Sequence, residues 1–328
     1  MTLPRLTQAF APLTSEIEAV NEFGEFLKIS IPAERALTVY VDKRELVTLM
    51  TLGANPELLV LGYLRNQRLV REVADIESIT VDWDVGAAAV KTRHGIEDIE
   101  EKTARRVVTT GCGQGSVFGG LMDEVDQIAL PADASITQCQ LYGLVNAIRL
   151  KETTYKSAGS VHACALFSTA ASDAEMLLFV EDVGRHNAID TIAGWMWIHL
   201  APTLLAAYGA LPPEGAAAPA VWRSQSCGPD LGGKVGPALA AGAAELVFYT
   251  TGRLTSEMVI KSAQMGVPIV VSRSGITQMG HQVAQAVGLC AIGRATNKRF
   301  LCYTHAERLK LQPGLVAMPS SLSGRNPE

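Results

Sequence analysis

Residues 246–292 read LVFYTTGRLTSEMVIKSAQMGVPIVVSRSGITQMGHQVAQAVGLCAI. Three short apolar runs in this stretch have the length and β-branched content of strands, and the two segments between them have the length of helices. The strands are expected at Leu246–Thr250, Pro268–Ser272 and Leu289–Ile292, and the helices at Thr255–Gln264 and Thr277–Val287. A glycine follows each helix, as is common after a helix C-terminus. Strands and helices that alternate with short turns predict a parallel sheet covered by helices on both faces.

Outward from this stretch, the sequence divides into two parts. The second part also has a helix expected over Ile136–Lys151, strands near Val161–Phe167 and Met176–Val180, and a helix from Arg185. The first part has strands expected at Phe26–Ile31, Ala36–Val41, Ile76–Trp83 and Ala87–Thr92, and a helix at Asn55–Asn66 with Pro56 in its first turn. We therefore predict an α/β protein with a small α+β domain over 22–130 and a larger α/β domain over 131–312. Residues 1–21 read as a loose lead-in, and residues 313–328 read as a disordered tail.

The composition excludes two broad classes of protein. The chain has 328 residues, 48% of them hydrophobic and 19% charged, which is too apolar for a disordered chain. Its 28 Lys and Arg against 33 Asp and Glu give a formal net charge of −5, and no long basic run occurs. A protein that binds nucleic acid by neutralising its phosphates with Lys and Arg side chains is therefore not expected.

The six cysteines are widely spaced, and none forms a Cys-x-x-Cys pair. They are Cys112, Cys139, Cys164, Cys227, Cys290 and Cys302. Because the N-terminus also lacks the pattern of a signal peptide, we expect a cytoplasmic protein with reduced thiols rather than a disulfide framework. Four of these cysteines lie in apolar contexts and are expected in the core, namely Cys139, Cys164, Cys290 and Cys302.

One stretch, Ile192–Leu211, has no acidic or basic side chain and is about long enough to span a bilayer. Pro202 interrupts it, His199 is polar, and no Lys or Arg cluster flanks either end. Two consecutive buried helices, broken before Pro202, explain the stretch better than a membrane span.

The segment Thr110-Gly-Cys-Gly-Gln-Gly-Ser116 combines a thiol with three glycines. Glycines leave the sulfur of Cys112 sterically open on a loop, which suits a thiolate that moves between partners. Alternatively, the segment is a tight turn and Cys112 takes part in no reaction. The third glycine of a dinucleotide-binding loop is replaced by Ser116, so that interpretation fails. Residues 228–235 (GPDLGGKV) resemble a phosphate-binding loop only by chance, since Val235 replaces the Ser or Thr that binds magnesium.

Three polar turns follow three of the predicted strands. They are Glu181-Asp-Val-Gly-Arg-His-Asn187, Thr251-Gly-Arg-Leu-Thr-Ser-Glu257 and Val271-Ser-Arg-Ser-Gly-Ile276. Ligands of parallel sheets bind beyond the carboxyl ends of the strands, and helix N-termini there offer free N–H groups to phosphate. We therefore expect these turns to bind a large, phosphate-bearing ligand, through Asp182, Arg185, His186, Asn187, Gly252 and Arg253 together with residues 271–276. Helix caps and solvated charges are the alternative for each turn.

His162 opens an apolar strand after a turn and is a further candidate ligand-binding residue, although a satisfied histidine at a strand start is as good an explanation. The surrounding sequence, Val161-His-Ala-Cys164, has Cys164 where a zinc deaminase has its catalytic Glu, and no Pro-Cys-x-x-Cys occurs in the chain. Deaminase chemistry is therefore excluded, and no metal site is predicted.

Together these segments resemble the formate dehydrogenase accessory sulfurtransferase family, FdhD. The match rests on Cys112-Gly113, His162-Ala163, Glu181-Asp-Val-Gly-Arg-His-Asn-Ala-Ile-Asp190, Gly252-Arg253 and Ser256-Glu-Met-Val-Ile-Lys261. Thr277 and Tyr303-Thr-His305 add to it, and weaker similarity over Asn55–Leu64 extends it across roughly Glu25 to Leu309. The run from Glu181 to Asp190 is its most specific element.

The resemblance implies a sulfur relay. Members of the family take persulfide sulfur from a cysteine desulfurase and pass it to the molybdenum cofactor, a bis-guanine-dinucleotide molybdopterin, for formate dehydrogenase. The persulfide cysteine maps onto Cys112, and the segment that contacts the cofactor maps onto Val271, Ser272, Arg273, Ser274, Gly275 and Ile276. The resemblance also implies a three-layer α/β/α domain similar to cytidine deaminases, and a homodimer.

The chain departs from the family pattern in its loop, where Gly115 replaces a second cysteine. A neighbouring resolving thiol is then absent, although one thiolate can carry and surrender one sulfur. The region 198–244 is also longer than usual, and Arg273 stands where an apolar residue is typical. We predict a sulfurtransferase. One alternative is a non-catalytic carrier of the cofactor. A second alternative, a guanine-nucleotide-binding regulator, rests only on the three turns that could bind phosphate.

Overall fold

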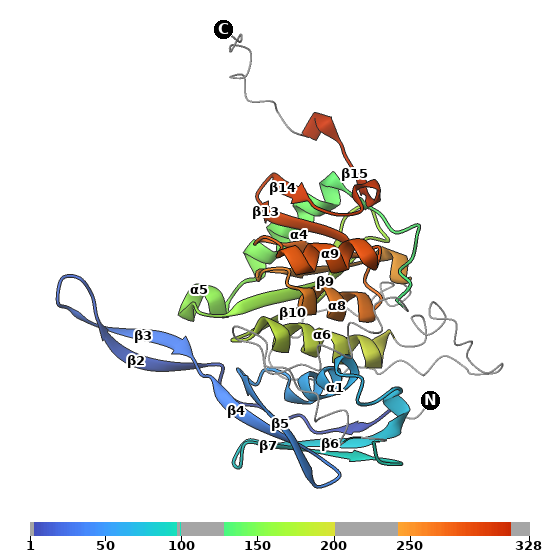
Figure 1. The fold of residues 1–328 in the computed structure, drawn as a ribbon. Helices are drawn as coiled ribbons and strands as arrows, with labels where there is room; N and C mark the ends of the chain where they lie inside the picture. Colours follow the sequence, from blue (N-terminus) through green and yellow to red (C-terminus); the bar gives the residue numbers. More distant parts are fainter. Residues whose placement is uncertain (1–2, 97–98, 100–127, 201–241, 316–328) are drawn as a thin grey trace.

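The computed structural model describes residues 3–96, 99, 128–200 and 242–315. Two β-sheets lie on either side of a pair of stacked helices, α1 (Pro56–Asn66) and α6 (Arg185–His199) (Figure 1). Cys112 and Cys227, the second half of the uncharged stretch and the tail 316–328 lie outside the described residues.

The first sheet has five strands in the order β1-β6-β7-β4-β5. Their bounds are β1 (Arg5–Leu6), β4 (Arg35–Val41), β5 (Arg44–Thr51), β6 (Ile76–Asp82) and β7 (Ala87–Thr92). The expected lead-in over residues 1–21 is wrong, because β1 pairs in parallel with β6 and a second strand begins at Thr14. Helix α1 begins with Pro56 and buries Leu59, Val60 and Leu64 against the sheet, close to a short 3₁₀ helix, η1 (Val73–Asp75).

The second sheet has six strands in the order β10-β9-β11-β12-β13-β14. Their bounds are β9 (His162–Ser168), β10 (Glu175–Asp182), β11 (Leu246–Thr250), β12 (Ile269–Ser272), β13 (Cys290–Thr296) and β14 (Arg299–Cys302). Strands β11, β12 and β13 are parallel, as predicted from residues 246–292, and β9 and β14 run antiparallel to their neighbours.

Alternate residues of these strands enter two separate cores. Helix α4 (Gln138–Lys151) covers one face, where Leu144 and Ile148 meet Phe167 and Val271. Helices α6, α8 (Ser256–Gln264) and α9 (Gln278–Ala286) cover the other face. The α/β class and the three layers of the larger domain are therefore confirmed. The remaining elements are short: α5 (Thr154–Ala158), β8 (Ile136–Thr137), β15 (Leu309–Lys310), η4 (Ala243–Glu245), η5 (Ala306–Arg308) and η6 (Pro313–Leu315).

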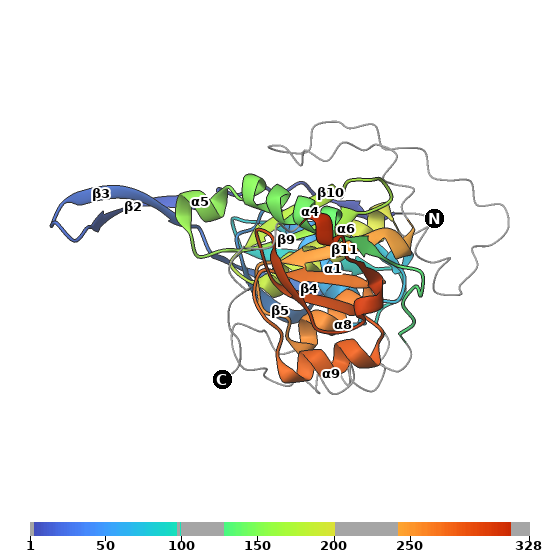
Figure 2. The same ribbon diagram turned by 90° about the horizontal axis from the view of Figure 1, so that it is seen from above.

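Strands β2 (Thr14–Val20) and β3 (Phe26–Pro32) form a hairpin that extends away from both sheets, with α5 near its base (Figure 2). Ile17 lies opposite Ile29, and these two side chains share one face of the hairpin. Phe23 and Phe26 near its tip are 79% and 74% exposed. The hairpin therefore presents large apolar side chains to solvent.

No helix among the described residues is both long and apolar enough to cross a bilayer. Helix α6 takes the first part of the uncharged stretch and ends at His199, before Pro202. Its residues Ile192 and Met196 are fully buried, and Trp197 reaches into the core of the first sheet. The first part of this stretch is therefore apolar because α6 packs against the cores of both sheets.

Helices α1 and α6 make a close backbone contact between the two parts of the fold. A Cβ atom on Gly62 of α1 would overlap the carbonyl oxygen of Asp190, and one on Gly194 of α6 would overlap the carbonyl oxygen of Leu58. Glycine at both positions is therefore required for the two helices to lie this close.

We expect Gly194→Ala to lower the free energy of unfolding by about 1–3 kcal/mol or more, because the new methyl group forces the helices apart. The matched control is Gly143→Ala on α4, where a Cβ meets nothing within 4 Å. This control should raise the free energy of unfolding by about 0.5–1 kcal/mol through helix propensity. Urea unfolding followed by circular dichroism measures both; equal effects in the two variants would contradict the close contact.

Candidate functional site

The predicted polar turns and His162 meet at one edge of the second sheet. Strands β10, β11 and β12 point the same way, so their carboxyl ends lie together. Strand β9 runs in the opposite direction and begins at this edge, where His162 pairs with Asp182. The N–H of Arg273 donates to the carbonyl oxygen of Thr250, which joins two of the turns directly.

The charges of three arginines act on His162 at this edge. Burial lowers the pKa of His162, and the positive charges of Arg185, Arg273 and Arg253 lower it further. The ring is therefore neutral at pH 7, in a local field that favours an anion. The guanidinium of Arg253 is exposed and has no hydrogen-bond or ion-pair partner within the described parts of the chain. Such a side chain is available for a ligand.

Arg273 is held from two directions. Its Nη1 lies 3.0 Å from Oε1 of Glu152, and its guanidinium carbon lies 5.3 Å from the centre of the Tyr155 ring. The side chain of Glu152 is 6% exposed, whereas that of Arg273 is 34% exposed. Arg273 is therefore positioned by α4 and α5, and it still reaches solvent.

Gly252 and residues 271–276 shape the backbone of this edge. A Cβ on Gly252 would lie 2.7 Å from Cδ of Arg185, so glycine is needed for Arg185 to cross the turn. The hydroxyl of Ser272 donates to the carbonyl oxygen of Gly252 (2.7 Å) and accepts from the N–H of Ser274 (2.9 Å). The carbonyl oxygen of Gly275 accepts from the N–H of Leu254, next to a bridge between Leu254 and Ile276. Val271 and Ser272 are themselves fully buried.

Asp182 and Asn187 hold the turn after β10 against the first sheet. The Asp182 carboxylate accepts from the hydroxyl of Thr51, the N–H of Leu52 (3.2 Å) and the N–H of Gly184 (3.0 Å). Asn187 donates through Nδ2 to the carbonyl oxygen of Met50 (2.6 Å) and to Asp182 (2.9 Å). Burial raises the pKa of Asp182, and these donors act in the opposite direction. Both side chains are thus engaged in contacts between the two sheets.

His186 lies beneath the edge in a buried charged cluster. Its Nε2 is 3.2 Å from Oε2 of Glu257, but burial lowers the pKa of His186 to about 2, and Lys261 and Arg185 contribute. The ring is therefore neutral, and the short distance does not make an ion pair. Nζ of Lys261 lies 2.9 Å from Asp190 and 3.7 Å from Glu257. Burial alone would lower the pKa of Lys261, yet Asp190 and Glu257 raise it, so the amine stays charged.

The cluster explains why two distant motifs occur together. Asp190 ends the run that begins at Glu181, and it also accepts from Nδ2 of Asn66 on α1 (2.7 Å). Glu257 and Lys261 belong to the run 256–261 on α8. Glu181 itself accepts from the N–H groups of Thr154 and Tyr155 at the start of α5. The two motifs therefore bond to each other and to neighbouring helices inside the protein.

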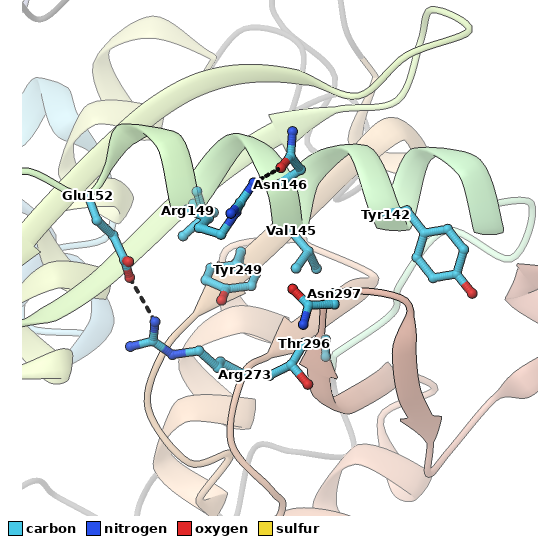
Figure 3. A pocket seen from close by; sticks show the side chains of 11 residues that line it. Tyr142, Val145, Asn146, Arg149, Glu152, Tyr249, Arg273, Thr296 and Asn297 are labelled. Atoms are coloured by element: carbon cyan, nitrogen blue, oxygen red, sulfur yellow. Dashed lines mark hydrogen bonds and ion pairs between the residues drawn. The ribbon is translucent and has the colours of Figure 1, made fainter.

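A cavity of about 240 Å³ opens beside Arg273, on the face of the sheet that α4 covers (Figure 3). Arg149 and Asn146 of α4 line one side of it, Tyr249 lies at its base, and Thr296 and Asn297 close the side toward β13. Sequence analysis missed these residues, because they come from a helix and two strands that are far apart in the chain. The one available signal was the polar side chain of Tyr249 in an otherwise apolar strand.

Comparison with known proteins agrees with this fold. The model of the FdhD/NarQ family matches residues 32–205 and 235–310. The chain belongs to this family. The resemblance inferred from the motifs is therefore confirmed.

Relatives in the family carry the name sulfur carrier protein FdhD. The one from Bacillus subtilis is 28% identical over 292 residues, which cover 88% of this chain and 94% of that protein. The one from Bacillus pumilus is 27% identical and covers 84% and 88%. A crystal structure described as that of a formate dehydrogenase accessory protein from Desulfotalea psychrophila superposes with a TM-score of 0.61 at 20% identity, covering 91% of this chain and 100% of the other.

The cysteines of this family member occupy different environments. Cys164 and Cys290 are buried, as predicted, and burial raises the pKa of Cys164 to about 12. Cys139 is exposed, so the prediction that it belongs to the core is wrong. Its side chain points outward because α4 turns only one face to the sheet, on which Leu141, Leu144 and Ile148 are buried. Cys302 is half-exposed, and the described residues contain no group of three or more His, Cys, Asp and Glu side chains that could hold a metal ion.

We expect Lys261→Met to lower the free energy of unfolding by about 3–5 kcal/mol at pH 7, because it leaves Asp190 buried without its cation. Burial raises the pKa of Asp190, and Lys261 now opposes that rise. In the variant the native state holds a proton on Asp190 that the unfolded state releases, so stability falls as pH rises above the usual aspartate range.

Urea unfolding at pH 5 and pH 8 measures this dependence. The loss caused by Lys261→Met should be smaller at pH 5 than at pH 8. The control is the double variant Lys261→Met with Asp190→Asn, which removes one of the two carboxylates beside Lys261 and should show a smaller difference. A loss that is the same at both pH values would contradict the buried pair.

Proposed function

We propose that this chain is a sulfur carrier that passes persulfide sulfur from a cysteine desulfurase to the molybdenum cofactor of formate dehydrogenase or a related molybdoenzyme. The names of its relatives support a sulfur-carrying role, and the name of the structural neighbour supports the link to formate dehydrogenase. The observation that carries the binding half of the proposal is that His162, exposed Arg253 and half-exposed Arg273 meet at one edge of the sheet. The observation that carries the sulfur half is Cys112 between two glycines.

In this proposal Cys112 is the catalytic residue. Its thiolate attacks the outer sulfur of the donor persulfide, which forms a persulfide on Cys112 and releases the donor cysteine as a thiolate. Glycines on both sides leave the sulfur accessible to donor and acceptor. A single cysteine suffices for this step, because no second thiol takes part. Cys112 lies outside the described residues, so its position relative to the sheet edge is part of the proposal.

The cofactor, a bis-guanine-dinucleotide molybdopterin, is the bound substrate in this proposal. Guanidinium groups make paired hydrogen bonds to phosphate oxygens, and they also bond O6 and N7 of guanine. Exposed Arg253 and half-exposed Arg273 would bind these groups. The backbone of Ser274 and Gly275, which follow Arg273 directly, would lie beside the ligand. The cavity lined by Arg149, Asn146 and Asn297 has the size and polarity for one further polar group of the same ligand.

Other residues of the predicted site support this edge rather than contact the ligand. Asp182, His186 and Asn187 are less than a tenth exposed and already contact protein groups. In the proposal they are positioning residues. We further propose that the chain acts in the cytoplasm as a homodimer, as the family resemblance implies.

The second candidate is a carrier of the cofactor that transfers no sulfur. Gly115 favours it, because the loop lacks the second cysteine of the family pattern. The two candidates share the binding edge and differ only at Cys112.

Incubation with a cysteine desulfurase and cysteine, followed by peptide mass spectrometry, separates them. We expect the peptide that contains Cys112 to gain one sulfur atom, which a thiol reductant removes. Cys112→Ala should lose this labelling and the activation of formate dehydrogenase, and Cys139→Ala should retain both. If Cys112 stays unlabelled while a two-cysteine relative is labelled in parallel, the sulfur carrier proposal fails and the cofactor carrier remains.

Binding of GDP, measured by isothermal titration calorimetry, tests the edge independently of sulfur. We expect Arg253→Ala and Arg273→Ala each to weaken binding roughly ten-fold or more, as for the loss of a charge-assisted hydrogen bond. Arg71→Ala, an exposed arginine in the first domain, is the control and should bind as the unaltered chain does. Unchanged affinity in both edge variants would place the ligand elsewhere.

A further inference from the structure

Two cysteines of the second sheet face each other at a place that the sulfur relay does not use. Cys290 begins β13 and Cys302 ends β14, and their Sγ atoms are 3.8 Å apart. The strands pair so that Cys302 lies opposite Ile292, which puts Cys290 on the adjacent diagonal of the same face. A disulfide between them would bring the two sulfurs from this separation to about 2.05 Å.

The two thiols are not equivalent. Cys290 is fully buried in the core under α4, whereas Cys302 is half-exposed at its margin. The hydrogen bond with Cys290 lowers the pKa of Cys302, and the same bond together with burial raises the pKa of Cys290. Sγ of Cys302 also lies 3.4 Å from the carbonyl oxygen of Thr304. Cys302 is thus the thiol that ionises first and that reagents reach first.

We propose that Cys290 and Cys302 form a redox thiol pair that reacts with low-molecular-weight disulfides and persulfides, with Cys302 as the attacking thiol and Cys290 as the resolving thiol. The arrangement of one accessible and one buried sulfur in contact carries this proposal. It does not depend on Cys112.

The reaction has two exchange steps. The Cys302 thiolate attacks one sulfur of R–S–S–R, forms the mixed disulfide Cys302–S–S–R and releases one thiolate, RS⁻. Cys290 then attacks Sγ of Cys302, forms the Cys290–Cys302 disulfide and releases the second RS⁻, while its proton passes to solvent or to the leaving thiolate. The two cysteines lose two electrons and the reagent gains them. When the group on Cys302 is a single sulfur, as after reaction with a persulfide, the second step releases hydrosulfide.

The pair is separate from the candidate site. The N–H of Cys290 donates to the carbonyl oxygen of Pro268, which directly precedes β12. The pair therefore lies at the amino ends of β12 and β13, whereas the arginines lie at the carboxyl ends of β10, β11 and β12. Oxidation here can be measured without disturbing the proposed cofactor edge.

Peptide mapping of the reduced full-length chain tests the proposal. Trypsin cleaves after Arg273, Arg294, Arg299 and Arg308, so Cys290 falls in peptide 274–294 and Cys302 in peptide 300–308. The protein is treated with glutathione disulfide, its remaining thiols are alkylated, and it is digested without reductant. We expect the two peptides to appear joined by a disulfide. The exposed thiol of Cys139 is the internal control, and it should carry glutathione.

The Cys290→Ala variant tests the division of roles. Glutathione should accumulate on Cys302 in this variant to a level roughly ten-fold above that in the unaltered chain, where Cys290 removes it. In Cys302→Ala neither product should form at Cys290. If both peptides are recovered alkylated and unlinked from the unaltered chain while Cys139 carries glutathione, the proposal is wrong, whether or not either variant folds.

A second arm replaces glutathione disulfide with inorganic polysulfide. The expected products are the same linked peptides and free hydrosulfide, which a colorimetric assay measures. A stable persulfide on Cys302, without the linked peptides, would overturn the resolving role of Cys290. Both arms give the same result in a Cys112→Ala background if the pair acts alone, so failure of the sulfur relay and failure of this proposal are distinguishable.

Discussion

Asp190 is buried between the two sheets, and the residues packed around it must compensate its negative charge. An isolated carboxylate in such a place would be costly, so it must be paired and hydrogen-bonded. Lys261 supplies the cation from α8, and Asn66 supplies a donor from α1. Gly62 of α1 and Gly194 of α6 permit the close helix contact that surrounds this carboxylate. One buried carboxylate on α6 thus bonds to both α8 and α1, which come from different parts of the chain.

The polar residues of the run Glu181–Asp190, the most specific element of the family resemblance, fall into two groups. Asp182, His186, Asn187 and Asp190 are buried, and all of them except His186 bond to residues of the first part of the fold. Arg185 crosses the neighbouring turn beside Gly252, and together with Arg253 and Arg273 it gives the edge its positive field around His162. These buried contacts thereby position the positively charged edge to which our proposal assigns the phosphate-bearing ligand.

The sulfur chemistry of the chain has two distinct environments in our proposals. Cys112 lies among glycines, so its reactivity depends on access and not on a neighbouring thiol. Cys290 and Cys302 lie in the framework of β13 and β14, where the position of each sulfur is set by strand pairing. The β2–β3 hairpin exposes large apolar side chains, and the buried contacts do not explain this surface.

Local sequence determined the elements of the larger sheet, because apolar runs of strand length and glycines after each helix act over a few residues. It also determined the three polar turns, since a turn after a buried strand needs polar residues. Tertiary structure alone decided which turn residues are exposed at the sheet edge and which are buried, because Asp190, Lys261 and Asn66 meet only when α1, α6 and α8 pack. The cavity beside Arg273, the exposure of Cys139 and the contact of Cys290 with Cys302 likewise join segments that are separate in the chain, and no periodicity of a single segment encodes such contacts.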